Sequence, residues 1–148
     1  MGLKLARRAD GRFVVLDVVR LRGDPAEVEA AIVNTARLDG RACRVGLPQD
    51  PGQAGKQQVA YLTGKLAGFA VESGVESGAK ETRAAPAAAQ VNAGNFAVVQ
   101  AHWTRSFLDE LADFPGRKDD QVDALSRAFG MLAAPAVPSA AERFRAMI

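Results

Sequence analysis

The chain has 148 residues, 48% of them apolar, which suffices for one compact domain that folds without disulfides or a structural metal. A single cysteine and a single histidine exclude an internal disulfide and a zinc cluster. The net charge of +2 permits nucleic-acid binding through a local patch but does not require it. Because no apolar run is long enough for a membrane span or a signal peptide, we expect a cytoplasmic protein without membrane contacts.

The first twenty residues predict a β-hairpin. Two apolar segments, 2–6 and 12–20, are joined around Asp10-Gly11, a dipeptide suited to a tight turn. Strict alternation would place two rows of side chains on opposite faces of the second strand: Phe13, Val15, Asp17 and Val19 on one, and Val14, Leu16 and Val18 on the other. We therefore expect both faces of this strand to be covered, with Asp17 in an otherwise apolar row.

Helices and strands alternate after the hairpin. The segment 24–27, Asp-Pro-Ala-Glu, has a cap acceptor, a first-turn proline and a glutamate three residues after the cap, and it predicts a helix to about Leu38. The other expected elements are a strand over 43–47, a helix over 53–66, a strand near 69–73, a helix over 80–93 interrupted or kinked by Pro86, a strand over 95–99, a helix around 103–111 and a last helix over 119–132. This alternation favours an α/β fold.

The Pro/Ala-rich composition after the last predicted helix is typical of a tail or a linker. We therefore expect one domain over residues 1–133 and a C-terminal tail over 134–148.

Carboxylates at the ends of predicted elements are the candidates for metal chemistry. Asp50 follows a short strand, and Asp119, Asp120 and Asp123 stand at the start of the last helix. Mg²⁺ and Mn²⁺ prefer oxygen ligands, and two such ions about 3.5–4 Å apart can clamp the attacking and leaving oxygens of a phosphodiester. Each aspartate also has an ordinary explanation, because aspartates cap helices and form turns before Pro-Gly.

Three cations are candidates for contact with DNA. Gly52, Gly55 and Lys56 resemble a phosphate-binding loop, but two residues rather than four separate the glycines, and no Ser or Thr follows the lysine. The glycines instead allow close backbone approach to a strand or a phosphate, with Lys56 as a point charge. Lys80 and Arg83 lie three residues apart on one helix face, where they would either contact phosphates or be solvated surface cations.

An ordered series of segments carries a family resemblance. The segments are FVVLDVVRLRGDPAEVEAAI, LPQDPGQAGK, GAKETRAAPAAAQVNAGNFAVV and FLDELADFPGRKDDQVDALSRAF. Over residues 3 to 132 the chain resembles the C-terminal nuclease domain of phage terminase large subunits. This resemblance implies a ribonuclease H-like α/β fold, with a mixed β-sheet flanked by helices and acidic residues that bind two Mg²⁺ or Mn²⁺ ions at the sheet centre.

The resemblance also implies roles for individual residues. Asp50 matches the second catalytic acid of the family, and the pair Asp119-Asp120 holds the third. Asp120 is the first choice, Asp119 supports it, and Asp123 is either a further metal ligand or structural, because helix register does not separate them. The family's first catalytic aspartate lies on a strand that precedes the hairpin, and no residue here matches it, so the first strand of the fold is expected to be missing.

The implied function is that of a metal-dependent endonuclease, a hydrolase that cuts concatemeric double-stranded DNA during bacteriophage genome packaging in the host cell. The implied partners are viral DNA, the terminase ATPase domain, the small terminase subunit and the portal. Because the site would lack one of three carboxylates, we expect the chain by itself to be weakly active or inactive. The alternative is a non-catalytic module of the packaging motor that contacts DNA or the portal. An unpaired sheet edge near the N-terminus further predicts self-association into a homo-oligomer.

Overall fold

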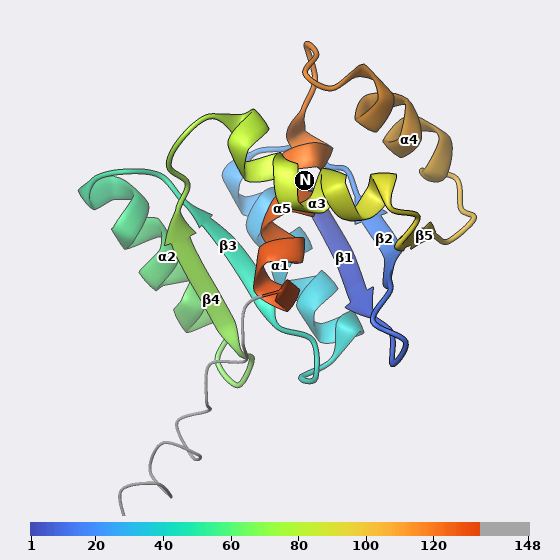
Figure 1. Cartoon of the computed structure of the whole chain (residues 1–148). Helices are drawn as coiled ribbons and strands as arrows, with labels where there is room; N and C mark the ends of the chain where they lie inside the picture. Colours follow the sequence, from blue (N-terminus) through green and yellow to red (C-terminus); the bar gives the residue numbers. More distant parts are fainter. Residues whose placement is uncertain (134–148) are drawn as a thin grey trace, which may run out of the picture.

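The computed structural model describes residues 1–133, which contain five strands and five helices (Figure 1). The elements are, in chain order, β1 Gly2–Arg7, β2 Phe13–Val19, α1 Pro25–Asp39, β3 Val45–Gln49, α2 Gln53–Lys65, β4 Val71–Val75, α3 Lys80–Asn92, β5 Phe96–Val98, α4 Thr104–Asp113 and α5 Asp120–Ala133. The predicted α/β class is confirmed. The predicted tail, 134–148, lies outside the described residues. No helix in the described part is long and apolar enough to cross a membrane.

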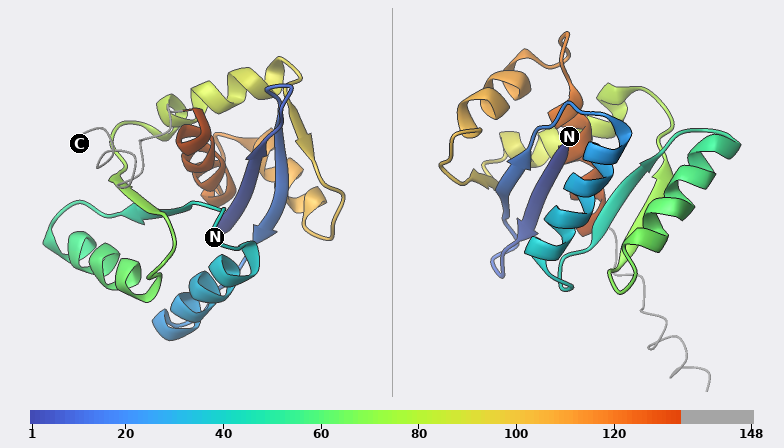
Figure 2. Two further views of the ribbon diagram at one scale, coloured as in Figure 1. Left: turned by 90° about the horizontal axis from the view of Figure 1, so that it is seen from below. Right: turned by 180° about the vertical axis from the view of Figure 1, so that it is seen from behind.

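The strands form two sheets rather than one. β2 pairs antiparallel with β1 and parallel with β5, while β3 and β4 pair in parallel in the second sheet. Across the molecule the strands lie in the order β5, β2, β1, β3, β4 (Figure 2), yet β1 and β3 are not hydrogen-bonded to each other. Each of these two strands therefore has an unpaired edge near the middle of the molecule.

Helices cover both faces of the strands. Figures 1 and 2 show α1 and α2 on one side and α3 and α5 on the other. α5 contacts both β1 and β3, so it spans the two sheets. At β3 the contact is close because Gly46 has no side chain, and a Cβ there would overlap the sulfur of Met131. The last helix thus joins the two halves of the fold.

Each sheet contributes to its own hydrophobic core. The first core joins β1, β2 and β5 to α3, α4 and α5, with Phe107 and Val15 completely or almost completely buried. In this core the ring of Phe13 stacks on that of Phe96, at 5.2 Å between centroids. The second core joins α1, α2, β3 and β4 around Leu47 and Leu66. Burial of these apolar side chains is the main driving force that fixes the helices on the sheets.

A β-bulge overturns the expected alternation in β2. Lys4 of β1 pairs with Asp17, but the next residue, Leu5, pairs with Val15, so Leu16 has no partner. The extra residue moves Val18 onto the buried face with Phe13 and Val15, and it leaves Leu16 and Asp17 exposed. The prediction that both faces of this strand are covered was wrong for this reason.

The capping box predicted at the start of the first helix is confirmed. Asp24 and Glu27 form the predicted capping box, with each side chain accepting a backbone N–H of the other at 2.9 Å. α3 continues through Pro86 and is therefore not interrupted there. Trp103, just before α4, and Phe107 within it are buried, whereas Leu108 is exposed.

Candidate functional site

Asp50 lies directly after β3, and its backbone packs against the first turn of α2. Gly52 has a φ of 98°, which reverses the chain before the helix, and Gly55 is buried. A Cβ on Gly55 would overlap the carbonyl oxygen of Asp50. The close backbone approach at this glycine is present, but its partner is the Asp50 backbone, in the turn after β3, rather than a strand or a phosphate. The Asp50 and Lys56 side chains are exposed, and neither forms an ion pair among the described residues.

The three aspartates at the start of α5 separate into two groups. Asp119 precedes the helix, and its carbonyl accepts the Asp123 N–H at 2.9 Å, which forms the first turn. The side chains of Asp119 and Asp123 contact α3, whereas Asp120 is the first residue of α5 and is exposed on another side. The tertiary structure thus resolves the register that the sequence left open.

Cations of α3 hold Asp119 and Asp123. The Lys80 ammonium lies 2.6 Å from Asp119 Oδ1 and 2.9 Å from Asp123 Oδ2. The Arg83 guanidinium donates to Asp123 Oδ1 at 2.9 Å and lies 3.4 Å from Glu76 Oε2. These contacts tie the first turns of α3 and α5 together.

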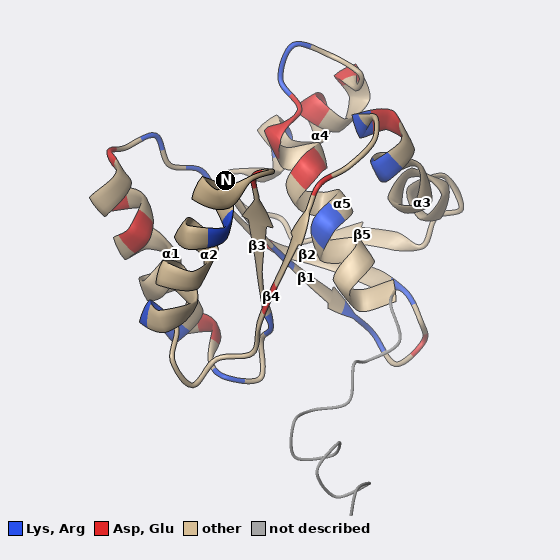
Figure 3. Cartoon of the chain, turned by 90° about the vertical axis from the view of Figure 1, so that its left-hand side faces the viewer, with Lys and Arg blue, Asp and Glu red and all other residues tan. Residues whose placement is uncertain are grey.

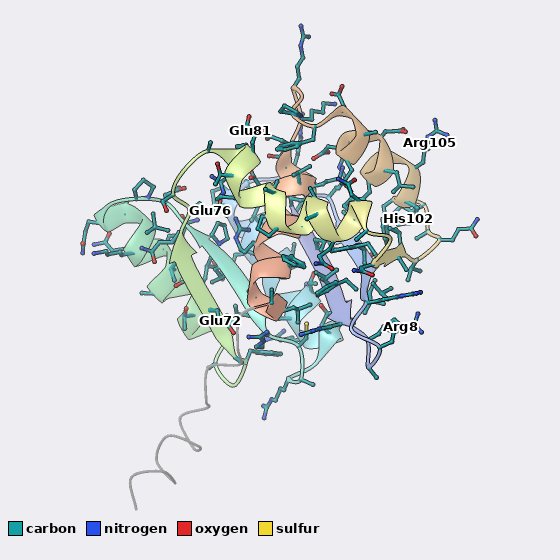
Figure 4. The ribbon with its side chains drawn as sticks, in the orientation of Figure 1. Arg8, Glu72, Glu76, Glu81, His102 and Arg105 are labelled. Carbon is teal, nitrogen blue, oxygen red and sulfur yellow. The ribbon has the colours of Figure 1, made fainter. Side chains whose placement is uncertain are left out.

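Glu76 extends the same charge network. This residue lies in the segment between β4 and α3, on the opposite side of the molecule from His102 and Arg105 (Figure 4). Its carboxylate forms ion pairs with Arg83 and with Arg127 of α5. Burial lowers the pKa of the Arg127 guanidinium below its usual value. Glu76 was not among the residues predicted from the sequence, because it lies in a Gly/Ser-rich loop with no motif.

The ion pairs have a clear electrostatic effect on Lys80. Hydrogen bonds from its ammonium to Asp119 and then to Asp123 raise the pKa of Lys80 well above its usual value, so the side chain stays charged at any physiological pH. Lys80 and Arg83 were predicted to contact DNA, and that role remains a prediction. In the structure both side chains form ion pairs with neighbouring carboxylates.

A cleft of about 480 Å³ lies beside the start of α5. Its lining includes residues of the segment before α1, the end of β3, the segment after β4, α4, the segment before α5 and α5 itself. Figure 3 shows Lys and Arg in the segments that precede α1 and α5. The acidic side chains that line it are Glu76, Glu110, Asp120 and Asp123, and the basic ones are Arg20, Arg22, Lys118 and Arg127. Pro48 lines the cleft, but Asp50 and Asp119 do not.

Glu110 is a buried carboxylate at this cleft, with only 8% of the residue exposed. It accepts the backbone N–H of Gln121 at 2.6 Å and the Gln121 side-chain amide at 2.5 Å, and so caps α5 from α4. Sequence reasoning missed this residue. The signal was its spacing, because Trp103, Phe107 and Glu110 are four and three residues apart and share the buried face of α4.

The predicted metal ligands do not form a ligand group by themselves. Within residues 1–133, no three carboxylate, imidazole or thiolate side chains lie close enough together to hold a metal ion. Asp120 and Asp123 line the cleft, Asp119 and Asp123 are paired with Lys80, and Asp50 is not among the residues that line the cleft.

Comparison with known families completes the description of the site. A family model described as a terminase RNaseH-like domain matches residues 1–132. No curated protein and no solved structure gives a significant match.

Proposed function

This chain belongs to the family of terminase RNase H-like domains, and we propose that it is the metal-dependent endonuclease module that cuts double-stranded DNA during viral genome packaging. The family match supports a nuclease-type module of a packaging terminase and a ribonuclease H-like fold. DNA cleavage, its Mg²⁺ or Mn²⁺ dependence, and the ATPase domain, small subunit and portal as partners belong to the proposal.

The observation that carries the proposal is the position of Asp120. This residue starts α5 and lines the cleft near the end of β3, and its side chain has no hydrogen-bond or ion-pair partner among the described residues. A carboxylate that is neither paired nor buried has its oxygen lone pairs available to a cation or a water molecule. Asp120 is therefore the catalytic residue on which we rely, with Asp50 as the second acid.

The residues present fit only part of a two-metal centre. Asp50 and Asp120 have the carboxylate oxygens that Mg²⁺ and Mn²⁺ prefer, but the described residues bring no three ligands together. Lys80 also occupies the oxygens of Asp119 and Asp123 that face α3. We propose that a strand paired between the open edges of β1 and β3 supplies the further acid, and that the chain alone is weakly active or inactive.

A plasmid-nicking assay with Mn²⁺ tests this function. It would compare this chain, a version extended upstream by the additional strand, and Asp120→Asn in both backgrounds. The matched control is Asp109→Asn, because Asp109 is an exposed aspartate whose one ion pair within residues 1–133 is with Arg105, four residues away on α4. We expect nicking by the extended version, a loss of about a hundredfold or more with Asp120→Asn, and no change with Asp109→Asn. Equal nicking by the extended protein and its Asp120→Asn variant would refute the assignment.

A non-catalytic module of the same motor is the second candidate function. The pairing of Lys80 with Asp119 and Asp123 favours it, because a carboxylate that is already neutralised attracts a metal less strongly. This function requires salt-sensitive DNA or portal binding that does not depend on a metal or on Asp120. If the upstream-extended version is folded and binds DNA in EDTA but does not nick the plasmid with Mn²⁺, the second function is the correct one.

A further inference from the structure

The cations that line the cleft differ in whether they already have a partner. Arg127 is paired with Glu76, but Arg20, Arg22 and Lys118 form no ion pair and no side-chain hydrogen bond among residues 1–133. All three are exposed, and they come from two segments far apart in the sequence, one before α1 and one before α5. The fold thus gathers three unneutralised positive charges around one concave surface.

These charges lie at the cleft that also contains Asp120. Lys118 is two residues before Asp120, and Arg20 and Arg22 line the same cleft from the segment before α1. A phosphodiester backbone carries one negative charge per nucleotide, and exposed arginines and lysines bind it by direct contact and by release of counterions. An anion held by these three side chains would be placed next to the candidate catalytic carboxylate.

The cations of α3 are in a different situation. Lys80 and Arg83 are engaged by Asp119, Asp123 and Glu76, and a phosphate could bind them only by displacing these carboxylates. Such an exchange replaces one set of charged contacts with another, so its net gain is small.

We propose that Arg20, Arg22 and Lys118 bind the DNA backbone at the Asp120 cleft, and that Lys80 and Arg83 instead position Asp119 and Asp123. The inference rests on the proposed function only in taking DNA as the ligand, because the binding step needs neither a metal nor cleavage. It names the surface on which the substrate lies and replaces the cations that the sequence suggested for this role.

Fluorescence anisotropy with a labelled duplex of about 20 base pairs, in EDTA, tests the proposal directly. The first variant is Arg20→Gln/Arg22→Gln/Lys118→Gln. The matched control is Arg12→Gln/Arg37→Gln/Arg41→Gln, which removes the same number of exposed cations that lack ion pairs in the described part of the chain. These control residues lie near the other ends of the strands, beside the β1–β2 turn and the end of α1 (Figure 1). A third variant, Lys80→Gln/Arg83→Gln, tests the cations of α3, and circular dichroism verifies that every variant is folded.

We expect the first variant to weaken DNA binding about tenfold or more and to reduce the slope of log affinity against log salt by about 3. The control and the α3 variant should each change the affinity by less than about threefold. Undetectable binding by the unmodified chain, an equal loss in the control, or a larger loss in the α3 variant would overturn the proposal. Competition by inorganic pyrophosphate as strong as that by duplex DNA would also overturn it, because the cleft would then bind small phosphates rather than a DNA backbone.

Nicking and binding fail independently of each other. Binding that depends on Arg20, Arg22 and Lys118, without nicking by the upstream-extended version, would leave this inference intact and reject the nuclease. Nicking that is unchanged when the three substitutions of the first variant are made in the extended version would support the nuclease and reject this inference.

Discussion

At the scale of single residues, the charged side chains of the site differ in whether they form ion pairs within the described fold. Asp119 and Asp123 are neutralised by Lys80 and Arg83, whereas the side chain of Asp120, between them in the sequence, has no partner within residues 1–133. Helix geometry explains this difference, because residues four apart share a face and a residue between them points elsewhere. Two of the three neighbouring aspartates are therefore held by ion pairs to α3, and Asp120 is the one that we propose for catalysis.

A second residue-scale feature is the pair of glycines in α2, which provides a matched test of how Asp50 is held. Gly55→Ala would place a methyl group against the Asp50 carbonyl oxygen, so we expect it to destabilise the fold by about 1–3 kcal/mol. Gly64→Ala meets open space in the same helix and should stabilise the fold by up to about 1 kcal/mol through helix propensity. Urea denaturation followed by circular dichroism measures both changes. Equal effects of the two substitutions would show that the α2 turn does not constrain Asp50.

At the scale of elements, α4 matters because it carries the acceptor for the start of α5. The N-terminal amides of a helix lack partners within the helix, and here Glu110 accepts that of Gln121. The Gln121 side chain is fully buried and donates to Glu110 and to the Ser106 carbonyl. The first turn of α5, and with it Asp120, is thus fixed by a neighbouring helix.

Removing the Glu110 carboxylate should therefore cost more than removing a surface acid. Glu110→Ala leaves buried donors of Gln121 without an acceptor, and we expect a loss of about 2–4 kcal/mol in the free energy of unfolding. The control, Asp109→Ala, removes only an exposed ion pair with Arg105 and should change stability by less than about 1 kcal/mol. Chemical denaturation gives both values, and a Glu110→Ala variant as stable as the control would contradict the capping role.

At the scale of the whole molecule, the main feature is the interruption between the two sheets. β1 and β3 are neighbours across the middle of the fold, are bridged by α5, and do not pair with each other. Backbone groups on an unpaired edge can bond to water, to an added strand or to a second copy of the chain. Self-association through these edges remains a prediction.

Amide hydrogen exchange should reveal these open edges in the chain as it stands. We expect the amides of β1 and β3 that point away from β2 and β4 to exchange markedly faster than those of Val14 and Val15, because β2 is paired on both sides there. Exchange measured by NMR at low protein concentration resolves the individual amides. Protection of the outer β1 amides equal to that of Val15 would mean that the edge is covered, and the proposed strand position would then be wrong.

The sequence by itself determined the order and type of the elements, the capping box at Asp24 and Glu27, and the resemblance that the family match supports. These features depend on local chemistry, namely periodicity, caps and turns, which neighbouring residues specify. The tertiary structure decided the bulge at Leu16, the pairing of Lys80 with Asp119, and the burial of Glu110. Each of these results from side chains or strands that are distant in sequence and meet only when the sheets and helices pack, so no local pattern could specify them.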